Sequence, residues 1–291
     1  MATKTKSRHT FARHVAPFAP LAMAMLMHTA SPGGGGTAET PPTEATEVSP
    51  GFSQMCSSPH FPAGGAPTSI DQTSCTLAGN GGAETWQNEA KNNFCAAGPS
   101  RPITIAEMVD MQTKVQQDGN IPFGNTHNHP LTATPGPATD RKPLQAMGEG
   151  TIVSLEGYVK LARQEGAESV NCGSNVANIA SNHDIHIAIV DSPGADECSG
   201  VVVEMVPHYR PASWTPANVN AVGSANLRVR VTGQLMFDSS HTPCRNGTSI
   251  QGDPKRSSLW EVHPIYQFDV CPQGSCNGGV GWVPLEQFAA K

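Results

Sequence analysis

The C-terminal half of the chain alternates between apolar and polar residues with the two-residue period of β-strands. In HDIHIAIVD, residues 183–191, the isoleucines fall on one face of the expected strand and the polar residues on the other. The same alternation recurs in residues 151–162, 200–209, 227–238 and 258–270. The pattern therefore predicts five strands, each with one apolar face for a shared interior.

A short helix is predicted between the third and fourth strands, in TPANVNAV. Thr215 stands at the N-cap position, Pro216 in the first turn, and Gly223 follows the last apolar residue. The order of three strands, one helix and two strands resembles the OB-fold, the oligonucleotide/oligosaccharide-binding superfamily, over residues 150–271. The resemblance implies a mainly β protein with a five-stranded Greek-key barrel, for which we set the bounds 149–276, followed by a C-terminal tail at 277–291.

Residues 51–148 are expected to form a cysteine-containing helical cap and a connector rich in Pro and Gly. One helix is predicted in residues 83–94. A second is predicted from residue 104, where Thr104 and Glu107 have the spacing of a capping box and Met108 begins an apolar stripe. His127 and His129 in the connector form an H-x-H pair of the kind that binds metals, but no carboxylate adjoins it in the sequence.

The first 30 residues have the order of an export signal. Basic residues at positions 4, 6, 8 and 13 precede an apolar stretch at 15–27, which is shorter than the roughly 20 residues of a membrane span. The alternative is an N-terminal tail of a cytosolic protein. Residues 31–50 have the composition of a flexible linker. The expected location is therefore the periplasm or the extracellular space.

The chain contains eight cysteines, an even number that in an exported protein favours disulfides. A structural zinc site needs paired short spacings, and only Cys271 and Cys276 lie close together, so zinc is the weaker alternative for the cysteines. The net charge of -6 provides no general attraction to nucleic acid or to anionic membranes. A single-stranded nucleic acid would need a local basic patch.

Two strands carry an acid and an imidazole on the same face. Asp184 and His186 stand two residues apart in D-I-H, and Glu261 and His263 repeat the spacing in E-V-H. At this spacing the two backbone positions lie about 6 to 7 Å apart, so both side chains can face one ligand. Pro264, which cannot donate a ladder hydrogen bond, indicates an edge position or a bulge, and a bulge would shift the inward face by one residue, to Ile265 or Tyr266.

These residues suggest a site on the polar face of the barrel. His186, His241 and His263 are candidate ligands of a divalent metal such as zinc, because imidazole nitrogens are common zinc ligands. The alternative is that these side chains face solvent and form cross-strand pairs, each contributing about 0.2 to 1 kcal/mol. The candidate ligand-binding residues, with arginines to meet an anionic group, are Asp184, Glu204, Arg210, Arg230, Arg256 and Glu261.

No phosphate-binding GxxxxGKS, no GxSxG and no HExxH motif is present, so no residue is assigned a catalytic role. The expected function is that of an exported OB-like protein that binds a small ligand, an oligosaccharide, a single-stranded nucleic acid or a protein. The alternatives are a metal-dependent hydrolase, similar to a phosphodiesterase or nuclease, and a structural protein of the cell envelope.

Overall fold

The structure is a computed structural model that describes residues 90–118, 142–166, 183–238, 241–245, 254–276 and 280–289. The expected export signal, the linker, the His127 and His129 pair and most of the helix expected at 83–94 lie outside the described residues.

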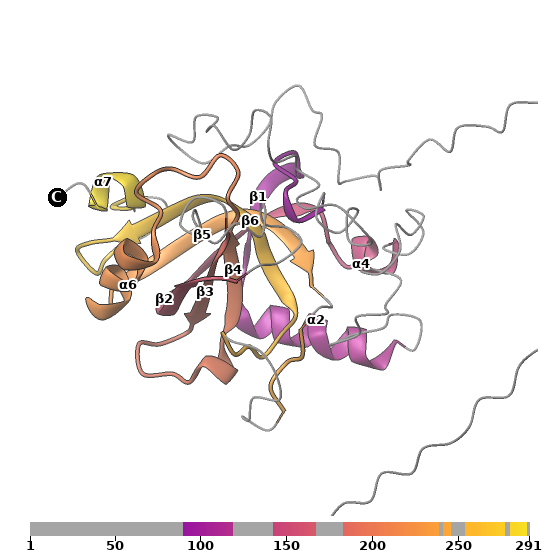
Figure 1. Ribbon diagram of the computed structural model, residues 1–291. Helices are drawn as coiled ribbons and strands as arrows, with labels where there is room; N and C mark the ends of the chain where they lie inside the picture. The colour runs from indigo at the N-terminus through magenta and orange to yellow at the C-terminus, as the bar shows by residue number, and fades with distance from the viewer. Residues whose placement is uncertain are drawn as a thin grey trace, which may run out of the picture. The chain divides into compact units, whose positions relative to one another are not determined.

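Five strands close into a barrel (Figure 1). They are β2 (Thr151–Gln164), β3 (Ile185–Val190), β4 (Val201–Met205), β5 (Arg228–Phe237) and β6 (Trp260–Cys271). Around the barrel the order is β2, β3, β4, β6, β5, and β5 pairs with β2 to complete the ring. All these pairs are antiparallel except β4 with β6, which is parallel. The five strands predicted from the alternation are confirmed.

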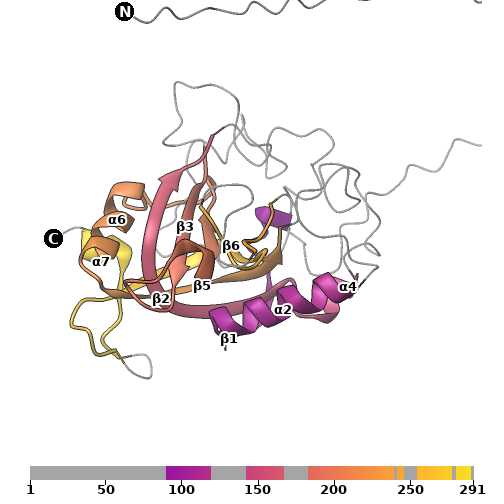
Figure 2. The ribbon, with the colours of Figure 1, turned by 90° about the horizontal axis from the view of Figure 1, so that it is seen from below.

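Short elements surround the barrel (Figure 2). On the N-terminal side are β1 (Ala97–Ile103), α2 (Ile105–Gln117) and α4 (Lys142–Ala146), and β1 pairs in parallel with β2. The short 3-10 helix η5 (Glu197–Ser199) precedes β4. The helix α6 (Pro216–Ser224) lies between β4 and β5 in the chain and packs on β2. At the C-terminal end are β7 (Val283–Pro284), which pairs with β6, and α7 (Leu285–Ala289).

The helix predicted from residue 104 is confirmed as α2, and half of its expected capping box forms. The Thr104 hydroxyl accepts a hydrogen bond from the backbone N–H of Glu107. The side chain of Glu107 does not return to the cap; it pairs with Arg101 at 2.7 Å. Met108 and Val115 of α2 belong to the same hydrophobic core as the strands, so this helix packs on the barrel itself.

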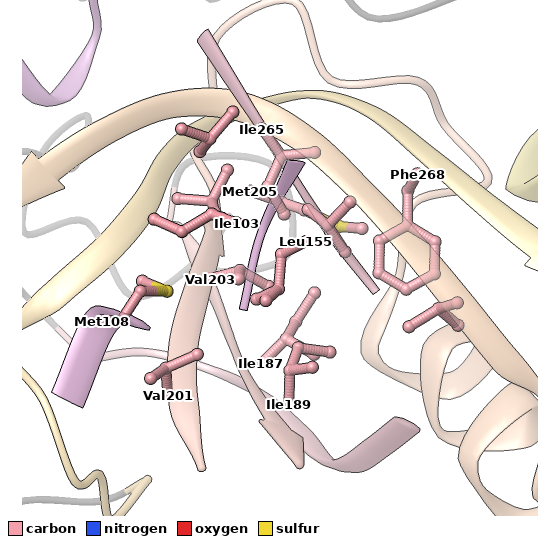
Figure 3. Packing of buried hydrophobic residues seen from close by; sticks show 14 of the residues in the cluster. Ile103, Met108, Leu155, Ile187, Ile189, Val201, Val203, Met205, Ile265 and Phe268 are labelled. Atoms are coloured by element: carbon pink, nitrogen blue, oxygen red, sulfur yellow. The ribbon is translucent and has the colours of Figure 1, made fainter. Parts of the chain in front are cut away.

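The apolar faces of the strands meet inside the barrel, as the alternation predicted (Figure 3). Leu155 of β2, Ile187 of β3 and Val203 of β4 are fully buried in one cluster. The ring of Trp260 packs edge-on against Phe237 with centroids 5.4 Å apart. No helix among the described residues is long and apolar enough to cross a membrane.

The shift of face near Pro264 is seen at Ile265 but does not persist to the end of β6, because Phe268 and Val270 also lie in the core. The register between β5 and β6 is irregular at Gly233, and Ile265 joins the same core as Trp260 and Val262 although it stands at an odd position. A Cβ atom on Gly233 would overlap the carbonyl oxygen of Pro264, so the two strands approach closely there because position 233 is a glycine.

Gly233→Ala is expected to destabilise the barrel by about 1 to 3 kcal/mol, because the added methyl meets backbone atoms that cannot yield without moving β6. Thermal melting followed by circular dichroism measures the loss. Gly194→Ala is the matched control, since a Cβ there meets no atom within 4 Å. Equal melting temperatures for the two variants would contradict the close approach.

Two disulfides are described, Cys198–Cys244 and Cys271–Cys276, and Cys95 is also disulfide-bonded. The prediction of disulfides is confirmed for these cysteines. The bond from Cys198 ties the segment before β4 to residues 241–245, which follow β5. This link holds the loop that carries His241 against the barrel.

Candidate metal centre

Glu204, in the middle of β4, is the residue around which the polar side chains gather. It stands directly opposite His186 of β3 in the antiparallel register. On its other side β4 pairs with β6 at Val203 and Val262, which brings Glu261 and His263 beside it. Side chains at these positions project to the face opposite the core, because the neighbouring residues Val203 and Val262 point inward.

Glu204 lies between two imidazoles. Its Oε1 atom is 3.1 Å from Nε2 of His186, and its Oε2 atom is 2.9 Å from Nδ1 of His263. Each of these nitrogens also faces a second carboxylate: His186 Nε2 is 3.2 Å from Asp184, and His263 Nδ1 is 3.3 Å from Glu261. Both D-I-H and E-V-H therefore contact the same glutamate.

Two groups of side chains on this face have the geometry of a metal site. We call Glu204, Asp238, His241 and Glu261 the four-residue group, and Asp184, His186 and Glu204 the three-residue group. Within each group one ligand atom of every residue lies within 4.8 Å of the others. Glu204 belongs to both groups.

This polar face is buried. The side chains of His186, Glu204, Glu261 and His263 are 0% exposed, so the alternative of solvent-facing residues is wrong for them. Part of the cover is a strap, residues 90–96, that lies across the barrel. Gln234 donates a hydrogen bond to the carbonyl of Ala90 at 2.8 Å, which places the strap on β5.

A hydrogen bond and a ring contact, both made by Tyr266, also hold the strap on the barrel. The Tyr266 hydroxyl of β6 donates to the carbonyl of Asn93 at 2.6 Å, and the ring of Phe94 packs against Tyr266 with centroids 5.8 Å apart. The position of this segment on the barrel was not predicted, because no periodic pattern links residues 90–96 to strands that lie more than 140 positions away.

Two cations enter the site and pair with two of its carboxylates. The ammonium of Lys91, in the strap, lies 2.7 Å from Oδ2 of Asp238. The guanidinium of Arg256 forms a salt bridge with Glu261 through Nη1, while its buried Nη2 has no hydrogen-bond partner in the described part of the chain. Glu204 is the one carboxylate of the four-residue group for which no described Lys or Arg forms a salt bridge.

Burial and charge shift the pKa values of these groups in different directions. Burial, together with the Glu204 carboxylate, raises the pKa of Glu261 to about 7. Burial lowers the pKa of His263, but the Glu204 carboxylate outweighs it and the pKa rises to about 9. Burial and the nearby Arg256 lower the pKa of His241 to about 3, so His241 is neutral at pH 7 and presents a nitrogen lone pair.

His241 connects the site to solvent. Its side chain is 17% exposed, whereas that of Asp238, 3.7 Å away, is 0% exposed. Its ring meets the ring of His186 edge-on with centroids 6.1 Å apart. Three carboxylates and one neutral imidazole form a mixed oxygen and nitrogen donor set, which suits zinc or manganese and lacks the thiolates of structural zinc sites.

The structure brings most of the predicted residues together. His186, His241, Asp184, Glu204 and Glu261 fall in the two groups. His263 contacts Glu204 and Glu261 but belongs to neither group, and Arg256 pairs with Glu261.

Two of the predicted arginines have other contacts. Arg210 donates a hydrogen bond to the carbonyl of Met205 at 3.1 Å. Burial lowers the pKa of Arg210 to about 10, and the nearby Asp184 carboxylate partly offsets that lowering. Arg230 pairs with Asp269 at 2.6 Å and lies over the ring of Trp282. No contact between Arg230 and the two groups is found among the described residues.

Two residues of the site were not predicted. Asp238 directly follows β5 and stands three positions before His241, and that proximity was the one available signal. Lys91 has no signal in the sequence.

Comparison of the chain with protein-family models, with curated proteins and with solved structures finds no match.

Proposed function

We propose that this protein is an exported, OB-like barrel that binds a divalent metal ion, zinc in the first instance, through the four-residue group. The observation that carries the proposal is the convergence of Glu204 from β4, Glu261 from β6, and Asp238 and His241 from the segment after β5, with one ligand atom of each within 4.8 Å of the others. Metal ligands at about 2.0 to 2.2 Å from a tetrahedral ion lie about 3.3 to 3.6 Å from one another, so small side-chain movements suffice.

The charge of the site supports a cation. Three carboxylates are buried together, and Lys91 and Arg256 pair with only two of them. Glu204, the third carboxylate, lies 2.9 Å from Nδ1 of His263, whose pKa of about 9 keeps that imidazole protonated at pH 7. A bound divalent ion would replace this proton as the positive charge beside Glu204 and would leave the imidazole neighbours neutral.

The order of the strands supports the OB-like assignment. The first barrel strand, β2, pairs with the second and the fourth, the last pairs with the third and the fourth, and α6 lies between the third and the fourth. The disulfides support export, because such bonds persist in oxidising compartments.

Calorimetric titration of the chelator-treated protein with zinc tests the function. We expect saturable binding, and thermal stability that rises by about 2.7 kcal/mol when free zinc reaches a hundred times the dissociation constant. Glu107→Gln is a matched control because Glu107 is exposed and pairs only with Arg101 at the protein surface. If the titration shows no saturable heat and zinc does not change the melting temperature, the proposal is wrong and the four-residue group has a structural role.

Zinc affinity is expected to fall as the pH drops below 7. The pKa of Glu261 is about 7, so below that pH a proton must leave the carboxyl before it can bind a metal. The competing proton on Glu261 lowers the affinity about tenfold per pH unit below the pKa of this carboxyl. Dissociation constants measured between about pH 5.5 and 7.5 check this slope; a constant affinity over that range would exclude Glu261 as a ligand.

A second candidate function is metal-dependent hydrolysis of a phosphodiester. Two observations favour it: His241 is partly exposed, which opens the site to water, and the unpartnered Nη2 of Arg256 is a donor for a phosphate oxygen. A metal-bound water would attack phosphorus and the ester oxygen would leave with a proton. Zinc-dependent hydrolysis of bis(4-nitrophenyl) phosphate that disappears in Asp238→Asn is the expected result. Activity that Asp238→Asn retains would assign the hydrolysis to a contaminant.

A further inference from the structure

The three-residue group has the spacing of a second metal position. Nε2 of His186 lies 3.1 Å from Glu204 and 3.2 Å from Asp184, within a few tenths of an ångström of the separation between ligands of one tetrahedral zinc ion. All three side chains are 0% exposed. One imidazole nitrogen thus stands between two buried carboxylates, where a metal ion can take the place of a proton.

Glu204 is placed to share two ions. Its Oε1 atom lies 3.1 Å from Nε2 of His186, a member of the three-residue group. Glu204 is also a member of the four-residue group. Neither of its oxygens accepts a hydrogen bond with good geometry from any described residue, although each lies near an imidazole nitrogen. A carboxylate with two such oxygens is the ordinary bridge between paired metal ions, which in two-metal sites stand about 3.5 to 4 Å apart.

The second ring nitrogen of His186 supplies an independent observation. Its Nδ1 atom lies 3.4 Å from Oε1 of Glu165, near enough to face this carboxylate although no hydrogen bond of good geometry joins the two among the described residues. A histidine that binds a metal through one nitrogen almost always turns the other toward a carboxylate or carbonyl, which fixes the ring and its tautomer. Glu165 is itself held by Arg163 at 2.6 Å.

We propose that the protein holds a dinuclear metal centre, in which Asp184 and His186 bind a second divalent ion and Glu204 bridges it to the first. Glu165 is a positioning residue that orients His186. The inference rests on the proposed function, because the first ion occupies the four-residue group. Its chemistry is that of a carboxylate-bridged pair of manganese or zinc ions.

Manganese binding tests the number of ions. We expect two ions per chain in the chelator-treated and reloaded protein by elemental analysis, and one in Asp184→Asn, which removes a ligand of the second position alone. Asp238→Asn, which removes a ligand of the first position alone, is the matched variant and is also expected to retain one. Electron paramagnetic resonance adds a second readout: a bridged pair couples magnetically, whereas either variant shows the hyperfine pattern of an isolated ion.

The outcomes separate the two proposals. One ion in the wild type with an isolated-ion spectrum, unchanged in Asp184→Asn, overturns the dinuclear centre and leaves the metal-binding function standing. No bound ion overturns both. Because Asp184 is buried, Glu165→Gln provides a milder variant. It is expected to lower the affinity for the second ion by about 10 to 100-fold and to leave the affinity for the first ion unchanged. Equal weakening of both ions would count against the assignment of Glu165.

Discussion

Glu204→Gln is expected to abolish zinc binding, with a loss of affinity greater than about 100-fold. Replacing a residue that only orients a metal ligand already lowers metal affinity about 10 to 100-fold. Glu204 is a ligand itself, a member of both groups, and the amide that replaces it has no charge. Calorimetric titration of the variant with zinc measures the loss.

Glu107→Gln makes the same chemical change on the exposed side of α2, where the pair with Arg101 is worth about 0 to 1 kcal/mol. It should bind zinc as the wild type does. A Glu204→Gln protein that folds and binds zinc with unchanged affinity would show that zinc binds elsewhere.

Lys91→Met is expected to destabilise the metal-free protein by about 3 to 5 kcal/mol, because it leaves the Asp238 carboxylate buried without its ammonium partner. For a domain of this size the melting temperature falls by about 6 to 20 °C. Saturating zinc should recover most of the loss, since the ion supplies positive charge next to Asp238. Melting with and without zinc measures both effects.

Lys160→Met is the matched control for this variant, because Lys160 is exposed on β2 and its replacement should change stability by less than about 0.5 kcal/mol. An equal loss of stability in Lys91→Met with and without zinc would mean that Lys91 stabilises the strap independently of the metal. That result would contradict the assignment of Asp238 as a ligand.

The barrel strands could be predicted from the sequence because their alternation is strong. Ile185, Ile187 and Ile189 point into one core, as their spacing requires. The strand β1 was not predicted, because AGPSRPI contains a glycine and two prolines and lacks alternation, and it forms where it can pair in parallel with β2. Long-range pairing decides such a strand, and a local pattern does not record it.

The site was predicted in part for a similar reason. Asp184 with His186 and Glu261 with His263 are visible as local pairs, but their meeting at Glu204 depends on the pairing of β4 with both β3 and β6. Their burial was not predicted, because part of the cover comes from the strap, whose hydrogen bonds to Gln234 and Tyr266 join segments far apart in the chain. The role of the E-V-H pair is therefore set by a residue on another strand.

The position of the metal can be observed directly by anomalous diffraction from crystals of the protein loaded with zinc, with data collected on both sides of the zinc absorption edge. A zinc ion in the four-residue group predicts a peak about 2.0 to 2.2 Å from carboxylate oxygens of Glu204, Asp238 and Glu261 and from a ring nitrogen of His241. An anomalous map without a peak among these residues, from crystals in which they are well ordered, would contradict it.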